Sequence, residues 1–295
     1  PMLGSEGCMV DMAACARALD DIGYDKWIVL ETSGRRDRFI EDTRANVEFA
    51  ALAAPDPGGS FVDDDGSVHE ATNGILGAGG AASLGVVPTG TGNDFAKACD
   101  IPLDWEHAVR LLADRIAAGQ EARRVDVGRM NDRYFANGAG IGFDARVTKI
   151  AHSYRMPIGD LVYLLAIFRG MAEGIATPRM RIMADDLVWD GPLTLANIAN
   201  GPWEGGMFHI APMASNGDGQ FDLMIAGPVS RRRILTLLPT LMSGKHIEEK
   251  EIMHRRVRQL TIEAEEPVLS HLDGEIQPPL RHLEISLLPG ALRLL

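Results

Sequence analysis

The spacing of apolar residues changes along the chain. In the first part, segments with helical spacing alternate with short runs of adjacent apolar residues, as in a parallel sheet layered with helices. Asp104 stands where it caps a helix that runs to Ala118 and stops at Gly119. The predicted elements are helices at 9–19, 38–52 and 105–118 and buried strands at 27–30 and 84–88, with a Pro/Gly-rich break at 54–59. This pattern predicts an α/β domain with a parallel sheet over residues 1–122.

From about Arg123 onward, apolar residues alternate with polar ones, which is typical of sheets with two different faces. The clearest alternations are Phe221, Leu223 and Ile225; Leu260, Ile262 and Ala264; and Leu283, Ile285 and Leu287. Several short strands favour a β-sandwich over residues 123–295. Helical insertions are expected at Gly159–Gly174 and Ser230–Gly244, the second kinked by Pro239. The predicted fold class is therefore α/β plus β, in two domains.

Composition narrows the function classes. The 295 residues are 46% hydrophobic, enough for two cores, and the formal net charge of -12 argues against a nucleic-acid-binding surface. No apolar run reaches the roughly 18 residues that span a bilayer, and no secretory signal opens the chain. Only three cysteines are present, without metal or redox spacing. We therefore expect a soluble cytoplasmic protein whose membrane contact, if any, is local.

A glycine-rich turn between the strand at 84–88 and a helix start has the layout of a phosphate-binding loop. Gly90 and Gly92 permit close backbone approach, Thr91 offers a hydroxyl, and the following helix presents free amides. The alternative is an ordinary strand-to-helix turn with Asn93 or Asp94 as the N-cap. Neither the Walker spacing nor the G-x-G-x-x-G spacing occurs here.

Four motifs, in order, resemble those of one family. Residues 88–96, Pro-Thr-Gly-Thr-Gly-Asn-Asp-Phe-Ala, resemble the P-x-G-T-x-N-D-[FL]-A signature of the diacylglycerol, sphingosine and bacterial lipid kinases. Residues 65–74 resemble the family's G-G-D-G-T-x-x-E-x-x-N-G segment, residues 200–222 its sandwich-domain pattern, and residues 272–275 its D-G-E motif. The resemblance covers about Ser60 to Leu295, and the ordered set is far more specific than any single motif.

The resemblance implies an ATP- and Mg²⁺-dependent lipid kinase that acts on diacylglycerol or a similar lipid at the membrane surface. Glu275 inherits the role of the base that takes the proton from the lipid hydroxyl. Asp65, Asp94 and Asp273 would help to hold Mg²⁺ and its waters. The residues implied at the nucleotide are Asp65, Gly66, Ser67, Glu70, Gly90, Thr91, Gly92 and Asn93. Asp218 and Asp222 occupy the region in which relatives hold a structural Mg²⁺.

Simpler interpretations stand beside these. Asp273-Gly274 is a common hairpin-turn dipeptide, and Asp218 and Asp222 fit a solvated turn. Three histidines near the motifs lack metal spacing and are interpreted as ordinary polar residues: His69, His209 and His271. The run Arg231–Arg233 fits a solvated helix start or contact with anionic headgroups.

The chain departs from the family pattern in two places. Asp63 and Asp64 stand where the family has two glycines, and their carboxylates should repel ATP. The first strand of the family, which ends in N-P-x-S-G, is missing. A catalytically decayed lipid-binding or regulatory protein is therefore the rival hypothesis. An NAD kinase shares the G-G-D-G-type loop, but the motifs at 88–96 and 272–275 fit lipid kinases better.

The sequence leaves the acyl-chain pocket and the oligomeric state open. Apolar residues such as Leu161, Leu164 and Ile167 would line the pocket, and a homodimer is compatible with the sequence. The central expectation is that the turn after Val87 and the carboxylate of Glu275 meet at one crevice.

Overall fold

The computed structural model describes residues 28–30, 65–154, 159, 161–185 and 187–295. The helices expected at 9–19 and 38–52, the break at 54–59, Asp63, Asp64 and the missing first strand all lie outside these residues. No helix in the described ranges is both long enough and apolar enough to cross a membrane.

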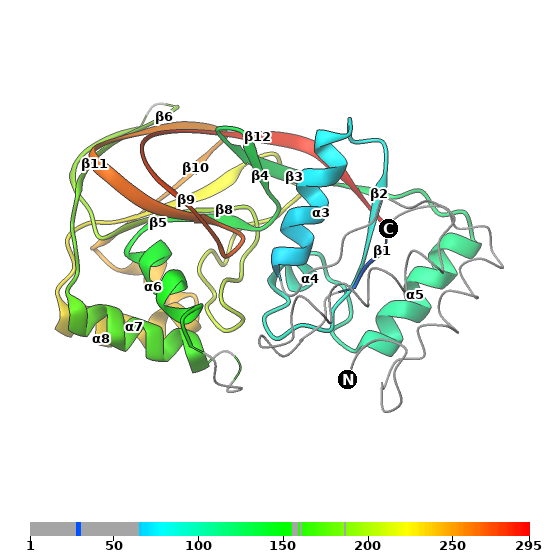
Figure 1. The fold of residues 1–295 in the computed structure, drawn as a ribbon, viewed down its shortest axis with the longest axis horizontal. Coiled ribbons are helices and arrows are strands. Elements are labelled where there is room, and N and C mark those ends of the chain that lie inside the picture. Colours follow the sequence, from blue (N-terminus) through cyan, green and yellow to red (C-terminus); the bar gives the residue numbers. More distant parts are fainter. Residues whose placement is uncertain (1–27, 31–64, 155–158, 160, 186) are drawn as a thin grey trace.

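The N-terminal region contains two short parallel strands, and its helices pack around them (Figure 1). Strand β1 (Ile28–Leu30) pairs in parallel with β2 (Ser83–Val87). The helices are α3 (Asp65–Gly77), α4 (Asp94–Ala98) and α5 (Trp105–Ala117). As predicted, Asp104 caps α5, its side chain accepting a hydrogen bond from the His107 N–H at 2.8 Å, and Gly119 follows the helix end with φ +61°. Residues 65–74, which the family resemblance places in a nucleotide-binding loop, instead form the start of α3.

The remainder of the chain is mostly strand. Its strands are β3 (Arg123–Met130), β4 (Arg133–Phe135), β5 (Gly138–Gly142), β6 (Arg179–Ala184), β7 (Leu187–Pro192), β8 (Leu195–Ala199), β9 (Phe221–Ala226), β10 (Ile252–Val257), β11 (Gln259–Leu272) and β12 (Glu275–Leu294). Helices α6 (Phe143–Ala151), α7 (Leu161–Glu173) and α8 (Arg231–Met242) lie together against one side of these strands (Figure 1). The short helix η1 (Lys245–Glu248) contacts α8 and β10.

The strands form one continuous sheet in the order β1-β2-β12-β11-β5-β8-β9-β10, with β3 and β6 pairing beside β12 and β11. Only the β1–β2 and β2–β12 pairings of the described strands are parallel. The architecture is therefore mixed α/β with a large, mainly antiparallel sheet and a sandwich-like C-terminal part. An extended parallel sheet over residues 1–122 is not established by these pairings.

Strand β12 joins the two parts of the molecule. It begins at Glu275 in a hairpin with β11, runs along β3, and ends with Arg293 and Leu294 beside Ser83 and Leu84 of β2. Leu292 and Leu294 pack with residues of α3 and β2 in the N-terminal core. The last residues of the chain are thus part of the region that precedes the glycine-rich turn.

The two helical insertions lie where the sequence predicts them, whereas the burial of strand β9 differs from the prediction. Helices α7 and α8 fall within the predicted segments, and Pro239 lies inside α8. Strand β9 was expected to have a buried and an exposed face, but all six of its residues are buried. It lies between β8 and β10, and Met224 on its second face packs with Ala211 and Ile210, which follow β8 in the chain. Helix α6 was not predicted.

Candidate active site

The glycine-rich turn joins the buried strand β2 to the short helix α4. Asn93 occupies the N-cap position with φ +54°, and its side chain makes no capping hydrogen bond. Instead, its amide Nδ2 donates to the Gly90 carbonyl at 2.8 Å, which ties the turn to itself. The simple N-cap interpretation therefore holds for the backbone position of Asn93 but not for its side chain.

Three polar atoms at this turn and at the start of α3 are buried without a hydrogen-bond partner among the described residues. They are Thr89 Oγ1, Asn93 Oδ1 and Ser67 Oγ. Burying a hydroxyl or amide oxygen without a partner costs about 1–3 kcal/mol. Unsatisfied groups of this kind are the donors and acceptors that a polar ligand satisfies.

Asp94 lies against the sandwich part of the chain. It is 3% exposed and accepts from the Gly206 N–H at 3.1 and 3.2 Å. Lys97 stands 3.4 Å from the same carboxylate and donates to the Gly206 carbonyl at 2.5 Å. The Lys97 ammonium also lies over the ring of Trp203, 5.7 Å from its centroid. Asp94 and Lys97 therefore hold the loop around residues 203–206 against α4.

The D-G-E segment is a tight turn between β11 and β12, as the simple interpretation suggested. Asp273 and Gly274 both have positive φ, +49° and +91°, which is typical of the two-residue turns that join antiparallel strands. The Asp273 carboxylate is enclosed. Oδ1 accepts from the N–H groups of Asn137 and Gly138 at 2.8 and 2.9 Å, and Oδ2 accepts from the Ala136 N–H at 2.8 Å.

A histidine from α3 completes this enclosure. His69 is fully buried, and its Nδ1 lies 3.1 Å from Asp273 Oδ2. On the other side of the ring, Nε2 faces the Arg133 guanidinium at 3.2 Å, so we assign the proton to Nδ1. Arg133 also pairs with the exposed Glu70 at 2.7 Å. Asp273 is therefore an anchor that fixes the turn, with four donors directed at its two oxygens.

Glu275 follows the anchored turn and is exposed, opposite Leu272 in the β11–β12 ladder. Its carboxylate meets the start of α3, because a Cβ added to Gly66 would stand 2.9 Å from Glu275 Oε1. Two predicted site residues from distant parts of the chain are thus in contact. The first turn of a helix also presents free backbone N–H groups, which favour anions.

A series of contacts connects this turn to the glycine-rich turn. Asn137, whose N–H binds Asp273, donates from its side chain to the Trp203 carbonyl at 2.8 Å. Trp203 in turn packs under Lys97, which pairs with Asp94. The structure therefore brings Gly66 and Glu275 together directly, and links them to Asp94 through Asn137 and Trp203.

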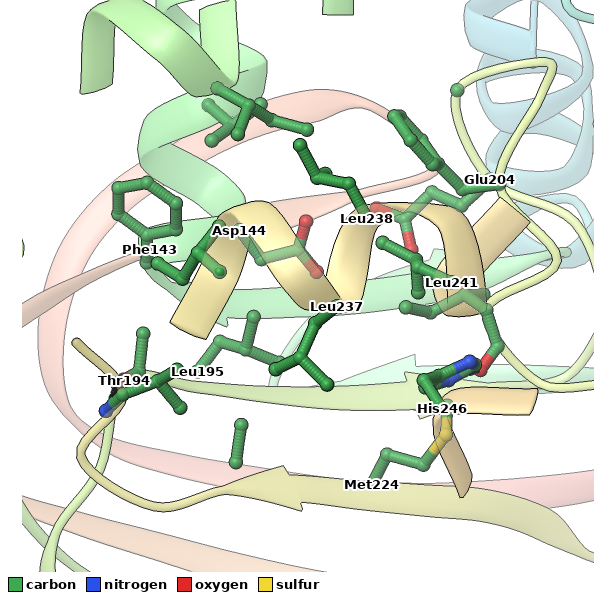
Figure 2. A pocket seen from close by; sticks show the side chains of 18 of the residues that line it. Phe143, Asp144, Thr194, Leu195, Glu204, Met224, Leu237, Leu238, Leu241 and His246 are labelled. Atoms are coloured by element: carbon green, nitrogen blue, oxygen red, sulfur yellow. Dashed lines mark hydrogen bonds between the residues drawn. The ribbon is translucent and has the colours of Figure 1, made fainter. Parts of the chain in front are cut away.

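An apolar cavity of about 140 Å³ lies between the sandwich and helices α6, α7 and α8 (Figure 2). Of the residues predicted to line an acyl-chain pocket, Ile167 lines it, whereas Leu161 is 52% exposed and Leu164 packs in the surrounding core. Two carboxylates stand in its wall, Asp144 of α6 and Glu204. Their side chains are 17% and 22% exposed.

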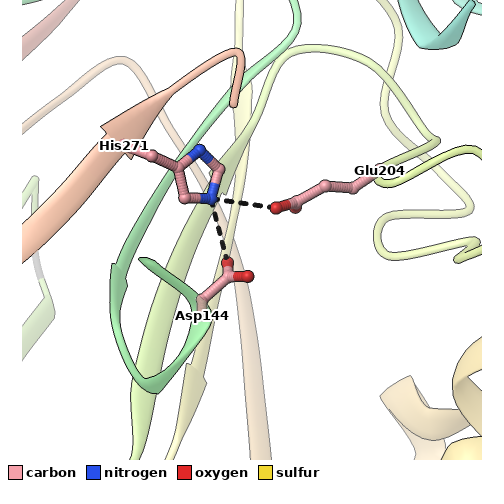
Figure 3. Close-up of side chains that lie close together, drawn as sticks. All are labelled: Asp144, Glu204 and His271. Carbon is pink, nitrogen blue, oxygen red and sulfur yellow. Dashed lines mark ion pairs between the residues drawn. The ribbon is translucent and has the colours of Figure 1, made fainter. Parts of the chain in front are cut away.

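Both carboxylates converge on His271 of β11 (Figure 3). His271 Nε2 lies 3.0 Å from Glu204 Oε1 and 3.8 Å from Asp144 Oδ2. Asn197 donates to both carboxylates, at 2.6 Å to Glu204 and 3.0 Å to Asp144. Burial, and then the charge of Asp144, raises the pKa of Glu204 to about 7. Burial tends to raise the pKa of Asp144, but the hydrogen bond to His271 and the charge of His271 have the larger effect, so the pKa of Asp144 is lowered.

Asp218 and Asp222 are each paired with a basic side chain. Asp218 contacts the Arg256 guanidinium, and the buried Asp222 lies 2.5 Å from His254 Nε2. Among the described residues, the group of three metal-ligand side chains that converges is Asp144, Glu204 and His271. A structural Mg²⁺ at Asp218 and Asp222 stays a prediction.

Comparison with known proteins decides the family. The model of the diacylglycerol kinase catalytic domain matches residues 64–130, and that of the YegS C-terminal NAD kinase beta sandwich-like domain matches residues 138–295. A Pseudomonas aeruginosa protein named "Probable lipid kinase YegS-like" is 35% identical over 263 residues, which cover 88% of this chain and 80% of the relative. The chain belongs to the diacylglycerol kinase family of lipid kinases.

Other members of the diacylglycerol kinase family are also similar to this chain in sequence or in structure. A protein of Bacillus subtilis named diacylglycerol kinase is 30% identical over 215 residues, 72% of this chain and 68% of its own. The crystal structure of a diacylglycerol kinase from Bacillus anthracis has a TM-score of 0.62 at 23% identity, covering 92% of this chain and 96% of that one. That likeness supports the fold. The names of the relatives favour a kinase over the decayed binding protein.

Sequence reasoning missed several residues in and around the candidate site. His69 and His271 were interpreted as ordinary polar residues, yet both are almost fully buried and contact carboxylates. Asp144 and Glu204 were not singled out at all. Spacing offers no signal for such contacts, because the partners lie on different helices, strands and loops. Arg233, expected in a solvated run, forms ion pairs with Glu249 and Glu251.

Proposed function

We propose that this protein transfers the γ-phosphoryl group of ATP to a hydroxyl of diacylglycerol or a related lipid. One observation carries the proposal: the exposed carboxylate of Glu275, on a turn anchored by Asp273, lies against Gly66 at the start of α3. In the reaction, Glu275 takes the hydroxyl proton while the lipid oxygen attacks the γ-phosphorus and the bond to the ADP oxygen breaks.

The nucleotide would lie between the glycine-rich turn and the first turn of α3. Gly90, Thr91, Gly92 and Asn93 supply the turn, and Gly66 and Ser67 supply backbone amides. The unsatisfied buried oxygens of Thr89, Asn93 and Ser67 fit a polar ligand at this place. Glu70, exposed and paired with Arg133, would lie at the edge.

Mg²⁺ would neutralise charge on the phosphates and would be held by Asp65 and Asp94, which the family resemblance assigns to it. Asp94 presents its carboxylate beside Lys97 and the Gly206 N–H, so a metal there would share it with these groups. We assign Asp273 a different role. Its oxygens already accept four hydrogen bonds, so it orients Glu275 instead of binding the ion.

The lipid would place an apolar chain in the cavity beside α6, α7 and α8, where Ile167, Leu237 and Leu238 line the wall. The same helices offer a surface for a bilayer. Leu161, Leu165 and Phe168 follow one another along one side of α7 and are 39–52% exposed. Arg231 and Arg232 are exposed at the start of α8 and fit anionic headgroups. The protein would therefore work at the inner surface of the cytoplasmic membrane without spanning it.

Transfer of radiolabelled phosphate from ATP to a panel of lipid alcohols tests the function. We expect labelled phosphatidic acid or a related phospholipid, formed only with Mg²⁺ and lost on chelation. Failure to label any lipid alcohol would contradict the proposal. Thermal unfolding with Mg-ATP distinguishes an active kinase from a decayed binding protein, because a ligand at about 100 times its dissociation constant stabilises a protein by about 2.7 kcal/mol. A decayed binding protein would show no such shift.

A further inference from the structure

His271 occupies a position that the fold has prepared for it. It is 2% exposed and lies opposite Gly140 in the β11–β5 ladder. A Cβ at residue 140 would overlap both the His271 Nε2 atom and the Asp144 carboxylate. The absence of a side chain at Gly140 therefore creates the space in which the ring and the two carboxylates meet.

The two ring nitrogens of His271 have different partners. Nδ1 accepts a hydrogen bond from the Gly274 N–H at 3.2 Å, and Nε2 faces Glu204 and Asp144. Because Nδ1 is an acceptor, the neutral ring carries its proton on Nε2, which faces Glu204 Oε1 at 3.0 Å. This tautomer leaves Nε2 without a lone pair, so the ring is not a metal ligand, and the three groups form a cluster of close polar contacts.

The charges of the cluster fit this assignment. Burial lowers the pKa of His271, whereas hydrogen bonding to Asp144 and Glu204 and their charges raise it by more. The three groups therefore share one extra proton near neutral pH.

The ring spans two functional parts of the molecule. On one side are Asp144 and Glu204, which stand in the cavity wall (Figure 2). On the other is Gly274, the residue immediately before Glu275. We propose that His271 is a positioning residue that links the polar wall of the cavity to the turn carrying Glu275, so that a lipid in the cavity and the catalytic carboxylate keep a fixed relative position. This inference rests on the proposed kinase function.

Two amide substitutions separate the two contacts. In His271→Asn, the amide oxygen stands near the place of Nδ1 and still accepts from Gly274, but nothing reaches Glu204. In His271→Gln, the amide stands near the place of Nε2 and still donates to Glu204, but Gly274 loses its acceptor. The control is His282→Asn, because His282 is exposed on β12 and its side chain pairs with Glu284 at 3.1 Å, away from the cavity and from the turn that carries Glu275.

Steady-state kinetics with mixed micelles of the lipid provide the first readout. We expect His271→Asn to raise KM for the lipid about tenfold with kcat within about threefold, and His271→Gln to lower kcat about tenfold with KM nearly unchanged. The His282→Asn control should match the wild type. If both His271 variants change the same parameter, or neither differs from the control, the proposal is wrong.

A second readout needs no activity and therefore separates this inference from the kinase function. In ¹⁵N spectra, His271 should be in the Nε2–H form, and added Zn²⁺ should leave its signals unchanged. Glu204→Gln should shift the Gly274 amide signal in the wild-type background but not in the His271→Asn background. A ring in the Nδ1–H form, a Zn²⁺-dependent shift, or a Gly274 signal indifferent to Glu204→Gln would overturn the proposal. A wild type that labels no lipid would instead refute the kinase function alone.

Discussion

The carboxylate of Glu275 and the backbone of Gly66 are in contact, although the two residues come from opposite halves of the chain: a Cβ at residue 66 would stand 2.9 Å from Glu275 Oε1. Gly66→Ala should therefore displace the end of a flexible side chain. We expect stability to change little and lipid phosphorylation to fall at least tenfold, since small displacements of a reacting group cost about 100-fold in the extreme. Gly74→Ala in the same helix meets nothing within 4 Å and is the matched control for the assay.

Glu275 and Asp273 should respond to substitution in opposite ways. Glu275→Gln removes an exposed base, so we expect phosphorylation to fall about 100-fold or more with an unchanged unfolding midpoint. Unchanged turnover would remove Glu275 from the mechanism.

Asp273→Asn replaces one accepting oxygen by an NH₂ group, which then faces backbone N–H donors that bind the wild-type carboxylate. We expect this substitution to lower the free energy of unfolding by about 3 kcal/mol. Urea denaturation measures it, and an Asp273→Asn protein as stable as the wild type would contradict the anchoring role.

The pKa of Glu204, raised from 4.5 to about 7, predicts a pH-dependent stability. The folded protein binds this proton more tightly than the unfolded chain, so the contribution of Glu204 is fully present below about pH 4.5 and is lost as the pH rises through about 7. Between about pH 5.5 and about pH 8, the unfolding free energy of the wild type should fall by about 1–2 kcal/mol relative to Glu204→Gln. Parallel pH profiles for the two proteins would show that Glu204 is already ionised at the lower pH.

The exposed side chains of α7 predict where a bilayer is contacted. Phe168→Gln should weaken sedimentation with anionic vesicles about tenfold, because burying a side chain of this size contributes about 1.5–3 kcal/mol. Val188→Gln is the matched control, since Val188 is 61% exposed but lies on β7, away from α7. Equal loss in both variants would mean that general surface hydrophobicity, and not α7, determines vesicle binding.

Local signals in the sequence were sufficient for many elements. The apolar run before the glycine-rich turn became β2, Asp104 capped α5, and Ser230 capped α8 by accepting from the Arg233 N–H. Such elements depend on residues within one turn or strand, so spacing and capping chemistry predict them. The D-G-E segment forms the hairpin turn that its Asp-Gly dipeptide offered as the simpler interpretation, whereas its favoured catalytic role stays a prediction.

Contacts between distant segments were not predictable in the same way. His69 meets Asp273 across 204 positions, and His271 meets Asp144 and Glu204 through the ladder of β11 and β5. These residues become neighbours only when helices, strands and loops from distant parts of the chain pack together. Helix α6 was missed because it begins directly after β5, with Gly142 at its N-cap, inside a stretch that otherwise has strand spacing. Whether the domain boundary falls at residue 122 stays a prediction.

The route of β12 has a consequence for how the polypeptide is made. Leu292 and Leu294 fill the core beside α3, and Arg293 pairs with Ser83 of β2. A nascent chain leaves the ribosome from its N-terminus, so the residues around the glycine-rich turn cannot complete their packing until β12, about 200 residues later, has been translated. Expressing residues 65–117 alone, or deleting residues 292–295, should therefore yield a protein prone to aggregation or proteolysis.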